Sequence, residues 1–95
     1  MQIAEVVGTV VSSRKEEVLE GLKFLALRPM SAEMVPESKL IVAADAVGAG
    51  VGEFVLFASG SAARQTVLTK NRPVDAVVMA IVDQVTVRGE LTYEK

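Results

Sequence analysis

The chain contains no cysteine, no histidine and no tryptophan, and these absences remove several classes of function. Without cysteine there is no disulfide framework and no thiolate to act as a nucleophile or ligand. Without histidine the chain has neither the commonest metal ligand nor the commonest general base, so a serine triad is unavailable. We therefore predict a protein without catalytic activity, cofactor or bound metal.

Aromatic residues and net charge are also scarce. One tyrosine and three phenylalanines make up the 4% aromatic content, and 10 basic against 12 acidic residues leave a net charge of −2. Single-stranded nucleic acids are bound by stacking aromatics in basic grooves, and anionic membranes attract basic patches. We expect neither partner for this chain.

No apolar run approaches the roughly 18 residues of a membrane span. The first residues, Met-Gln-Ile-Ala-Glu, lack the basic region that opens a signal peptide. These two absences predict a soluble, cytoplasmic protein.

What the chain has in abundance is small apolar side chains. Hydrophobic residues make up 51% of its 95 residues, and its mean hydropathy is +0.40. A chain of this length forms one small domain, residues 1–95, which leaves a large share of its surface exposed. Extended exposed apolar area usually marks an interface, so the composition predicts an obligate oligomer.

Five runs of β-branched or apolar residues predict strands. They cover residues 3–13, 22–28, 40–45, 53–59 and 77–87, and residues 91–93 add a short edge. Both faces of the first and last runs are apolar, and Gly8 within the first fits the bend or bulge of a small barrel. Strands that are apolar on both sides predict an all-β fold with a small closed barrel of about five strands.

Two segments have helical signals. Ser61 precedes four good helix formers, so we expect it to cap one short helix over residues 62–65. Ser13 and Glu16 have the spacing of a capping box, which leaves a short helix or a solvated loop open for the charged connection 14–21. The loop is favoured there because the pattern is weak by itself.

Three glycines, Gly48, Gly50 and Gly52, alternate with small residues and superficially match a phosphate-binding loop. That fingerprint needs a helix directly after it, whereas residues 54–57 form a strand pattern. We therefore interpret the glycines as a structural turn, in which Gly48 and Gly50 supply positive φ or close backbone approach.

The charged residues do not form a recognisable catalytic set. The acidic residues are interpreted as caps, turn residues and partners of arginine, because they have no regular ligand spacing; they are Asp45, Glu53, Asp75 and Asp83. Arg64 has two interpretations, which are an internal ion pair and a guanidinium fork that fixes a neighbouring chain.

Three separate stretches carry a resemblance to a known family. They are residues 44–50 (Ala-Asp-Ala-Val-Gly-Ala-Gly), 60–65 (Gly-Ser-Ala-Ala-Arg-Gln) and 72–76 (Arg-Pro-Val-Asp-Ala). On these stretches, and on residues 1–11 and 80–83, the sequence resembles the EutN/CcmL family of bacterial microcompartment shell vertex proteins. The resemblance implies an OB-like five-stranded β-barrel that assembles as a homopentamer, closes the vertices of a polyhedral shell and brings no catalytic residues.

The resemblance also implies partners and a place in the cell. Hexameric and trimeric shell proteins would surround the pentamer, within the shell of a microcompartment in the bacterial cytoplasm. The family's signature positions become candidates for subunit contacts or for the surface near the five-fold axis; they are Asp45, Gly48, Gly50, Gly60, Ser61, Arg64, Gln65 and Asp75. The alternative from another class is an OB-fold module that binds single-stranded nucleic acid.

Overall fold

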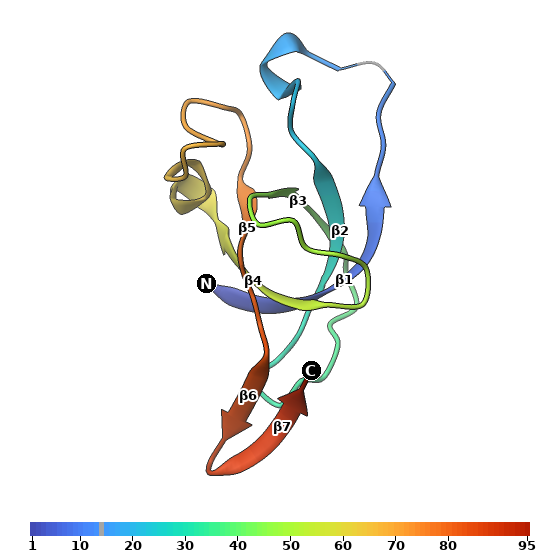
Figure 1. The fold of residues 1–95 in the computed structure, drawn as a ribbon, viewed down its shortest axis with the longest axis vertical. Helices are drawn as coiled ribbons and strands as arrows, with labels where there is room; N and C mark the ends of the chain where they lie inside the picture. The colour runs from blue at the N-terminus through green and yellow to red at the C-terminus, as the bar shows by residue number, and fades with distance from the viewer. Residues whose placement is uncertain (14) are drawn as a thin grey trace.

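The computed structural model describes residues 1–13 and 15–95, and its centre is a barrel of five strands (Figure 1). The strands are β1 (Gln2–Val10), β2 (Phe24–Pro29), β3 (Ile41–Asp45), β4 (Phe54–Ser59) and β5 (Ala76–Ile81). Their order around the barrel is β1-β2-β3-β5-β4, and the pairing of β1 with β4 closes it. Neighbouring strands are antiparallel except β3 and β5, which are parallel. The predicted closed barrel is confirmed.

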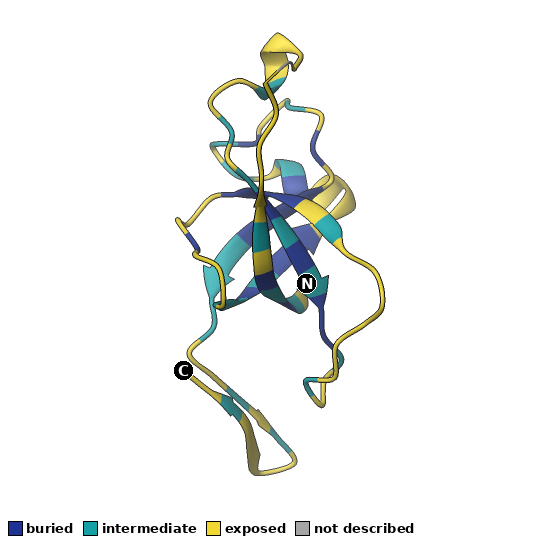
Figure 2. Cartoon of the chain, turned by 90° about the vertical axis from the view of Figure 1, so that its right-hand side faces the viewer, coloured by how far each residue is buried: buried dark blue, intermediate teal, exposed yellow. Residues whose placement is uncertain are grey.

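Alternate residues of the strands fill the barrel interior. Leu25 and Leu27 of β2 are buried, as are Val55 and Phe57 of β4, while residues between them are less covered. Successive side chains of a strand point to opposite faces, so this alternation separates an inner face from an outer one. Figure 2 shows the buried residues gathered in the barrel and the exposed ones in the loops above and below it.

A second apolar cluster covers the outside of the barrel. It consists of Ala44, Ala58, Ala63, Val74 and Val77. These residues bring a short 3-10 helix, η2 (Gly60–Arg64), and the chain before β5 against strands β3, β4 and β5. Strands in this part of the barrel are therefore covered on both sides, which explains why their sequence is apolar on both faces.

The bulge predicted at Gly8 is present. The register of β1 against β2 moves from Val6 opposite Leu27 to Gly8 opposite Ala26, so one residue of β1 has no counterpart. Beyond the bulge β1 ends at Val10, three residues before the predicted end. Val11 lies outside the strand with 91% of its surface exposed.

The prediction of a single strand over residues 77–87 is wrong, because this stretch contains parts of two strands. β5 ends at Ile81, and β6 (Gln84–Val87) pairs with β7 (Glu90–Glu94) in a separate two-stranded hairpin. At the junction the Val82 N–H donates to the Phe54 carbonyl at 2.7 Å, and the Asp83 carbonyl accepts from the Lys95 N–H at 2.8 Å. The backbone therefore bonds to β4 at Val82 and to the residue after β7 at Asp83. The hairpin extends away from the barrel (Figure 1).

The helical predictions need correction in detail. The connection after β1 contains a 3-10 turn, η1 (Glu17–Leu19), whose preceding residue, Glu16, makes no capping side-chain bond. Ser61 does not cap η2, because that turn begins at Gly60 and Ser61 lies inside it. Gly60 has φ +66 and its N–H donates to the Asp75 carbonyl at 2.8 Å, and the helical turn begins two residues earlier than predicted. Arg14, within the predicted connection, is outside the described residues.

Among the described residues no helix has the length and apolar character needed to cross a membrane.

Candidate functional site

The structure places the candidate residues in two groups. The turn after β3 holds Asp45, Gly48 and Gly50, and the corner around η2 holds the others, which are Gly60, Ser61, Arg64, Gln65 and Asp75. The two groups are built differently, the first around a buried carboxylate and the second around backbone carbonyls.

Asp45 organises the turn after β3. The residue is only 7% exposed, and its Oδ1 accepts hydrogen bonds from the N–H groups of Val47, Gly48 and Ala49 at 3.0, 3.0 and 3.4 Å. A buried carboxylate is costly unless it is hydrogen-bonded, and here three donors converge on one oxygen. Gly48 has φ +78, a left-handed conformation that favours glycine. The interpretation of this stretch as a structural turn is confirmed.

The backbone conformation of Gly50 differs from the one predicted from the sequence. The positive φ angles of the turn belong to Gly48 and Gly52, whereas Gly50 is not among the residues with positive φ. A Cβ on Gly50 would lie 3.5 Å from Glu53 Oε1, which is ordinary contact. What Gly50 contributes is its N–H, which donates to Glu53 Oε1 at 2.6 Å.

Glu53 also connects the turn to the end of the chain. Its Oε2 forms an ion pair with Lys95 Nζ at 2.7 Å. The hydrogen bond with Lys95, together with that from the Gly50 N–H, lowers the pKa of Glu53, and the same hydrogen bond with Glu53 raises the pKa of Lys95. Beside this pair the rings of Phe54 and Tyr93 meet with centroids 4.3 Å apart and an angle of 54°. These contacts hold the hairpin of β6 and β7 against the start of β4.

The hairpin attachment was not found from the sequence. In the sequence Glu53 is one of several acidic residues without regular ligand spacing, and no pattern indicates a role for Lys95. The spacing of Gly50 and Glu53 is a local signal for their bond, but nothing in the sequence indicates a partner for Glu53 that lies 42 residues further along.

At the corner of η2, Arg64 bonds to a backbone carbonyl. Its Nη1 donates to the Val74 carbonyl at 3.0 Å, and the side chain is half-buried. Within residues 1–13 and 15–95 the one ion pair is that of Lys95 with Glu53, so the interpretation of Arg64 as half of an internal ion pair is wrong. Asp75 contributes its carbonyl to Gly60 and is exposed, as are Ser61 and Gln65.

Large apolar side chains are exposed at several places on the surface. Those at least half exposed, Met1 aside, are Val11, Val18, Val35, Leu40, Val42, Val51, Val67 and Leu91. Val67 is completely exposed. Single exposed apolar residues are normal, but so many on a chain of 95 residues agree with a protein that buries further surface on assembly.

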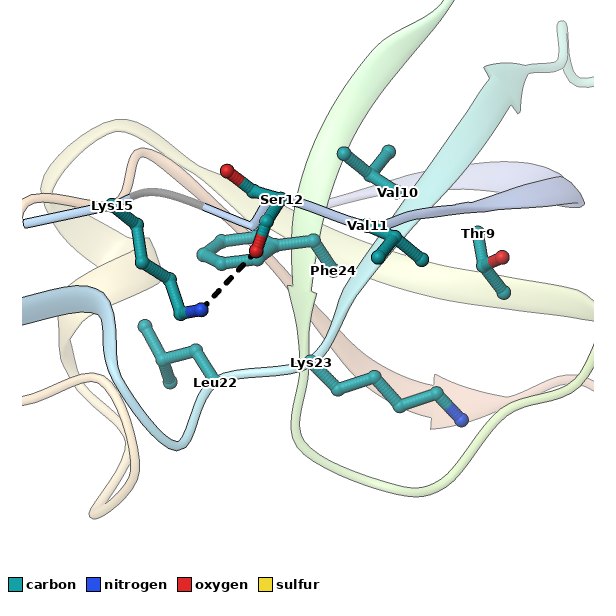
Figure 3. Close-up of a pocket in the computed structure, with 8 residues that line it drawn as sticks. All are labelled: Thr9, Val10, Val11, Ser12, Lys15, Leu22, Lys23 and Phe24. Carbon is teal, nitrogen blue, oxygen red and sulfur yellow. Dashed lines mark hydrogen bonds between the residues drawn. The ribbon is translucent and has the colours of Figure 1, made fainter.

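One of these apolar regions forms a groove of about 460 Å³ where β1 leaves the barrel and β2 enters it. Figure 3 shows Val10 and Val11 on the β1 side of the groove, and Leu22 and Phe24 on the β2 side. Lys15 Nζ, at the rim, donates to the Ser12 carbonyl at 3.2 Å. The groove lies at the end of the barrel opposite the hairpin (Figure 1).

Acidic side chains do not gather into a metal cage in the part of the chain that the structure describes. The recognisable features are a closed barrel, a glycine turn anchored by a carboxylate, a polar corner and an attached hairpin. These features define the class of the protein, which is a small β-barrel protein that presents surfaces for contact with other molecules.

The chain belongs to the EutN/CcmL family, whose model, described as "Ethanolamine utilisation protein EutN/carboxysome", matches residues 1–83. The match ends at the junction where the chain leaves the barrel, so the hairpin lies beyond it. The resemblance stated from the sequence is confirmed.

Individual relatives are similar over nearly their whole length. The chain is 52% identical to the carboxysome shell vertex protein CcmL of Gloeobacter violaceus over 95 residues, covering 100% of this chain and 95% of the relative. The solved structure of that protein has a TM-score of 0.95, with 100% of this chain and 98% of that chain covered.

Two further relatives are more distant. The microcompartment shell vertex protein EutN of Escherichia coli is 37% identical over 95 residues, with 100% of both chains covered, and its structure has a TM-score of 0.87. The vertex protein GrpN of Rhodospirillum rubrum is 41% identical over 85 residues, with 90% and 96% covered. Its structure, described as a pentameric microcompartment shell protein, has a TM-score of 0.83 and covers 92% and 99%.

Proposed function

We propose that this chain is a structural component of a bacterial microcompartment shell and forms the homopentameric cap of its vertices. The observation that carries the proposal is the full-length similarity to CcmL of Gloeobacter violaceus, at 52% identity and a TM-score of 0.95. EutN and GrpN, which are also named shell vertex proteins, support it, and GrpN is described as pentameric. The role requires no catalysis.

The exposed apolar residues give the ring a driving force. Removing apolar surface from water contributes about 25 cal/mol per Å². Val11 beside the groove, and Val67 after η2, are almost wholly or wholly exposed in the single chain. Contact with a neighbouring copy is the simplest way to cover such side chains in a protein that assembles with itself.

The two groups of candidate residues suit different parts of a ring. The turn at Asp45–Gly50 contains the exposed apolar side chain of Val47 and is followed by that of Val51, which suits a contact between subunits. The corner of η2 presents the polar side chains Ser61 and Gln65, which suit the solvent-facing surface near the five-fold axis. We assign the two groups to these two places.

Hexameric and trimeric shell proteins are the proposed neighbours of the pentamer, in a shell in the bacterial cytoplasm. The support is the name of the relatives, because a vertex exists only where facets meet. The nucleic-acid alternative gains no support, since Phe57 is buried and Phe54 packs against Tyr93. Stacking on bases needs exposed rings.

The proposal is tested by mass and by assembly. Light scattering on the purified protein should report five chains of 10.1 kDa, about 50 kDa. Added to hexameric shell proteins that alone form open sheets or tubes, the protein should produce closed particles. A stable monomer of 10.1 kDa, or closed particles that form equally well without the protein, would overturn it.

A further inference from the structure

An open hollow of about 510 Å³ lies beside η2, and every side chain that lines it is polar or charged. The lining consists of Ser61, Arg64, Gln65, Lys70 and Asn71. Two of these residues are cations and none is an acid, although acidic residues outnumber basic ones in the chain as a whole. All of them come from residues 61–71, so one segment of one chain builds the hollow.

Arg64 is held in place but not neutralised. The bond from its Nη1 to the Val74 carbonyl uses one of the five N–H donors of the guanidinium and fixes the planar group. No carboxylate pairs with it among the described residues. Its remaining donors are therefore available to a ligand with oxygen acceptors, and a guanidinium fork matches phosphate oxygens well.

Lys70 is positioned by a buried threonine. Thr69 is 0% exposed; its Oγ1 donates to the Ala63 carbonyl at 2.6 Å and its N–H donates to Thr66 Oγ1 at 3.0 Å. The Lys70 N–H donates to the Thr66 carbonyl at 3.0 Å. These bonds tie the segment after η2 back onto η2, so the backbone of Lys70 is held beside the hollow that its side chain lines.

The next residue completes the lining. Asn71 has φ +62, a left-handed conformation that asparagine tolerates better than most residues. The turn it makes keeps its own side chain at the hollow. An amide there, with the amide of Gln65 and the hydroxyl of Ser61, adds neutral hydrogen-bond donors around the two cations.

We propose that this hollow binds a phosphate group, either free or carried by a small organic molecule. The guanidinium held by the Val74 carbonyl and the nearby lysine side chain together match the dianionic charge of a phosphate monoester near neutral pH, and the neutral donors can bond its remaining oxygens. The hollow also leaves room for an organic part beside the phosphate. All five lining residues belong to one chain, so the proposal goes beyond the structural role.

Binding is measured on the full-length, ¹⁵N-labelled protein by NMR, with chloride keeping the ionic strength constant. Inorganic phosphate and glycerol phosphate are the probes, and acetate is the singly charged comparison. The expected result is saturable shifts confined to the amides of residues 61–71 and their contacts, with acetate weaker than either phosphate. Tighter binding of glycerol phosphate identifies a phosphate ester as the ligand, and equal binding identifies free phosphate. Shifts that do not saturate, or that spread over the surface, overturn the proposal.

A pair of matched variants sharpens the test. Lys70→Gln should raise the dissociation constant about five- to tenfold, because one of two charge-assisted contacts is lost. Lys39→Gln removes another exposed lysine, which does not line the hollow, and should leave the constant unchanged. An unchanged constant for Lys70→Gln overturns the site. The mass of each sample is measured alongside, so that binding by a protein that forms no ring counts against the vertex role and not against the hollow.

Discussion

Replacing Asp45 with alanine removes the side chain that holds the turn after β3. Three backbone N–H groups then lose their acceptor, and the one at Ala49 is in a buried residue. A hydrogen bond to a charged group contributes about 1.5–3 kcal/mol, and the loss of a capping side chain costs about 0.5–2 kcal/mol. Water reaches the exposed N–H groups of Val47 and Gly48 in the variant, so the three bonds do not add in full. We expect Asp45→Ala to lower the free energy of unfolding by about 2–4 kcal/mol.

Denaturation measures this loss. For a chain of this size each 1 kcal/mol lowers the thermal midpoint by about 4–8 °C, so the midpoint should fall by at least about 8 °C. Circular dichroism follows it at one fixed protein concentration, because assembly makes the midpoint depend on concentration.

Two control variants separate the hydrogen bonds from other effects. Asp45→Asn keeps an acceptor oxygen and should recover more than half of the loss. Asp75→Ala removes an exposed aspartate whose contribution at this corner is its backbone carbonyl, and it should stay within about 0.5 kcal/mol of the parent. The reasoning is refuted if Asp45→Ala is as stable as the parent, or if Asp45→Asn is as damaging as Asp45→Ala.

Two other predictions concern the hairpin and the glycine turn. Because the pKa of Glu53 is lowered in the folded state, its ion pair stabilises the hairpin above the ordinary carboxyl pKa of 4.5, and this contribution is lost as pH falls through the lower folded value. The fluorescence of Tyr93, the one tyrosine in a chain without tryptophan, should report the loosening, and Glu53→Gln should abolish that pH response; an identical response in the variant would contradict the assignment. In the turn, Gly48→Val should cost about 1–3 kcal/mol because its φ is positive, whereas Gly50→Ala should cost less than about 1 kcal/mol, and chemical denaturation should show the two in that order. Equal costs would mean that φ does not decide the tolerance of the turn.

Much of the barrel could be predicted because its determinants are local. Apolar runs located each of its five strands, and Gly8 located the bulge. The alternating glycines indicated the turn after the third strand, and the structure adds that Asp45 holds it by bonding to backbone only a few residues away. The family could also be stated from short stretches of residues, because a signature is a property of the sequence itself.

Two errors, in the last predicted strand and at Arg64, occurred where distance along the chain matters. The sequence predicted one strand over residues 77–87 because its apolar residues recur with a period of two. Such a pattern shows that side chains are covered, but it does not show which strand the backbone pairs with. Arg64 donates to the Val74 carbonyl and not to a carboxylate, because its partner depends on how β5 approaches η2.

The sequence by itself determined the small apolar composition, the five strands, the turn and the family, and it excluded chemistry that needs cysteine or histidine. Only the tertiary structure decided that the hairpin separates at Asp83, that Glu53 meets Lys95, and that Arg64 and Lys70 share one hollow. The physical reason is that propensity and periodicity act over a few residues. The Glu53–Lys95 ion pair exists only after the barrel has formed and brought distant segments together, and the hollow exists only after the segment after η2 has folded back onto η2.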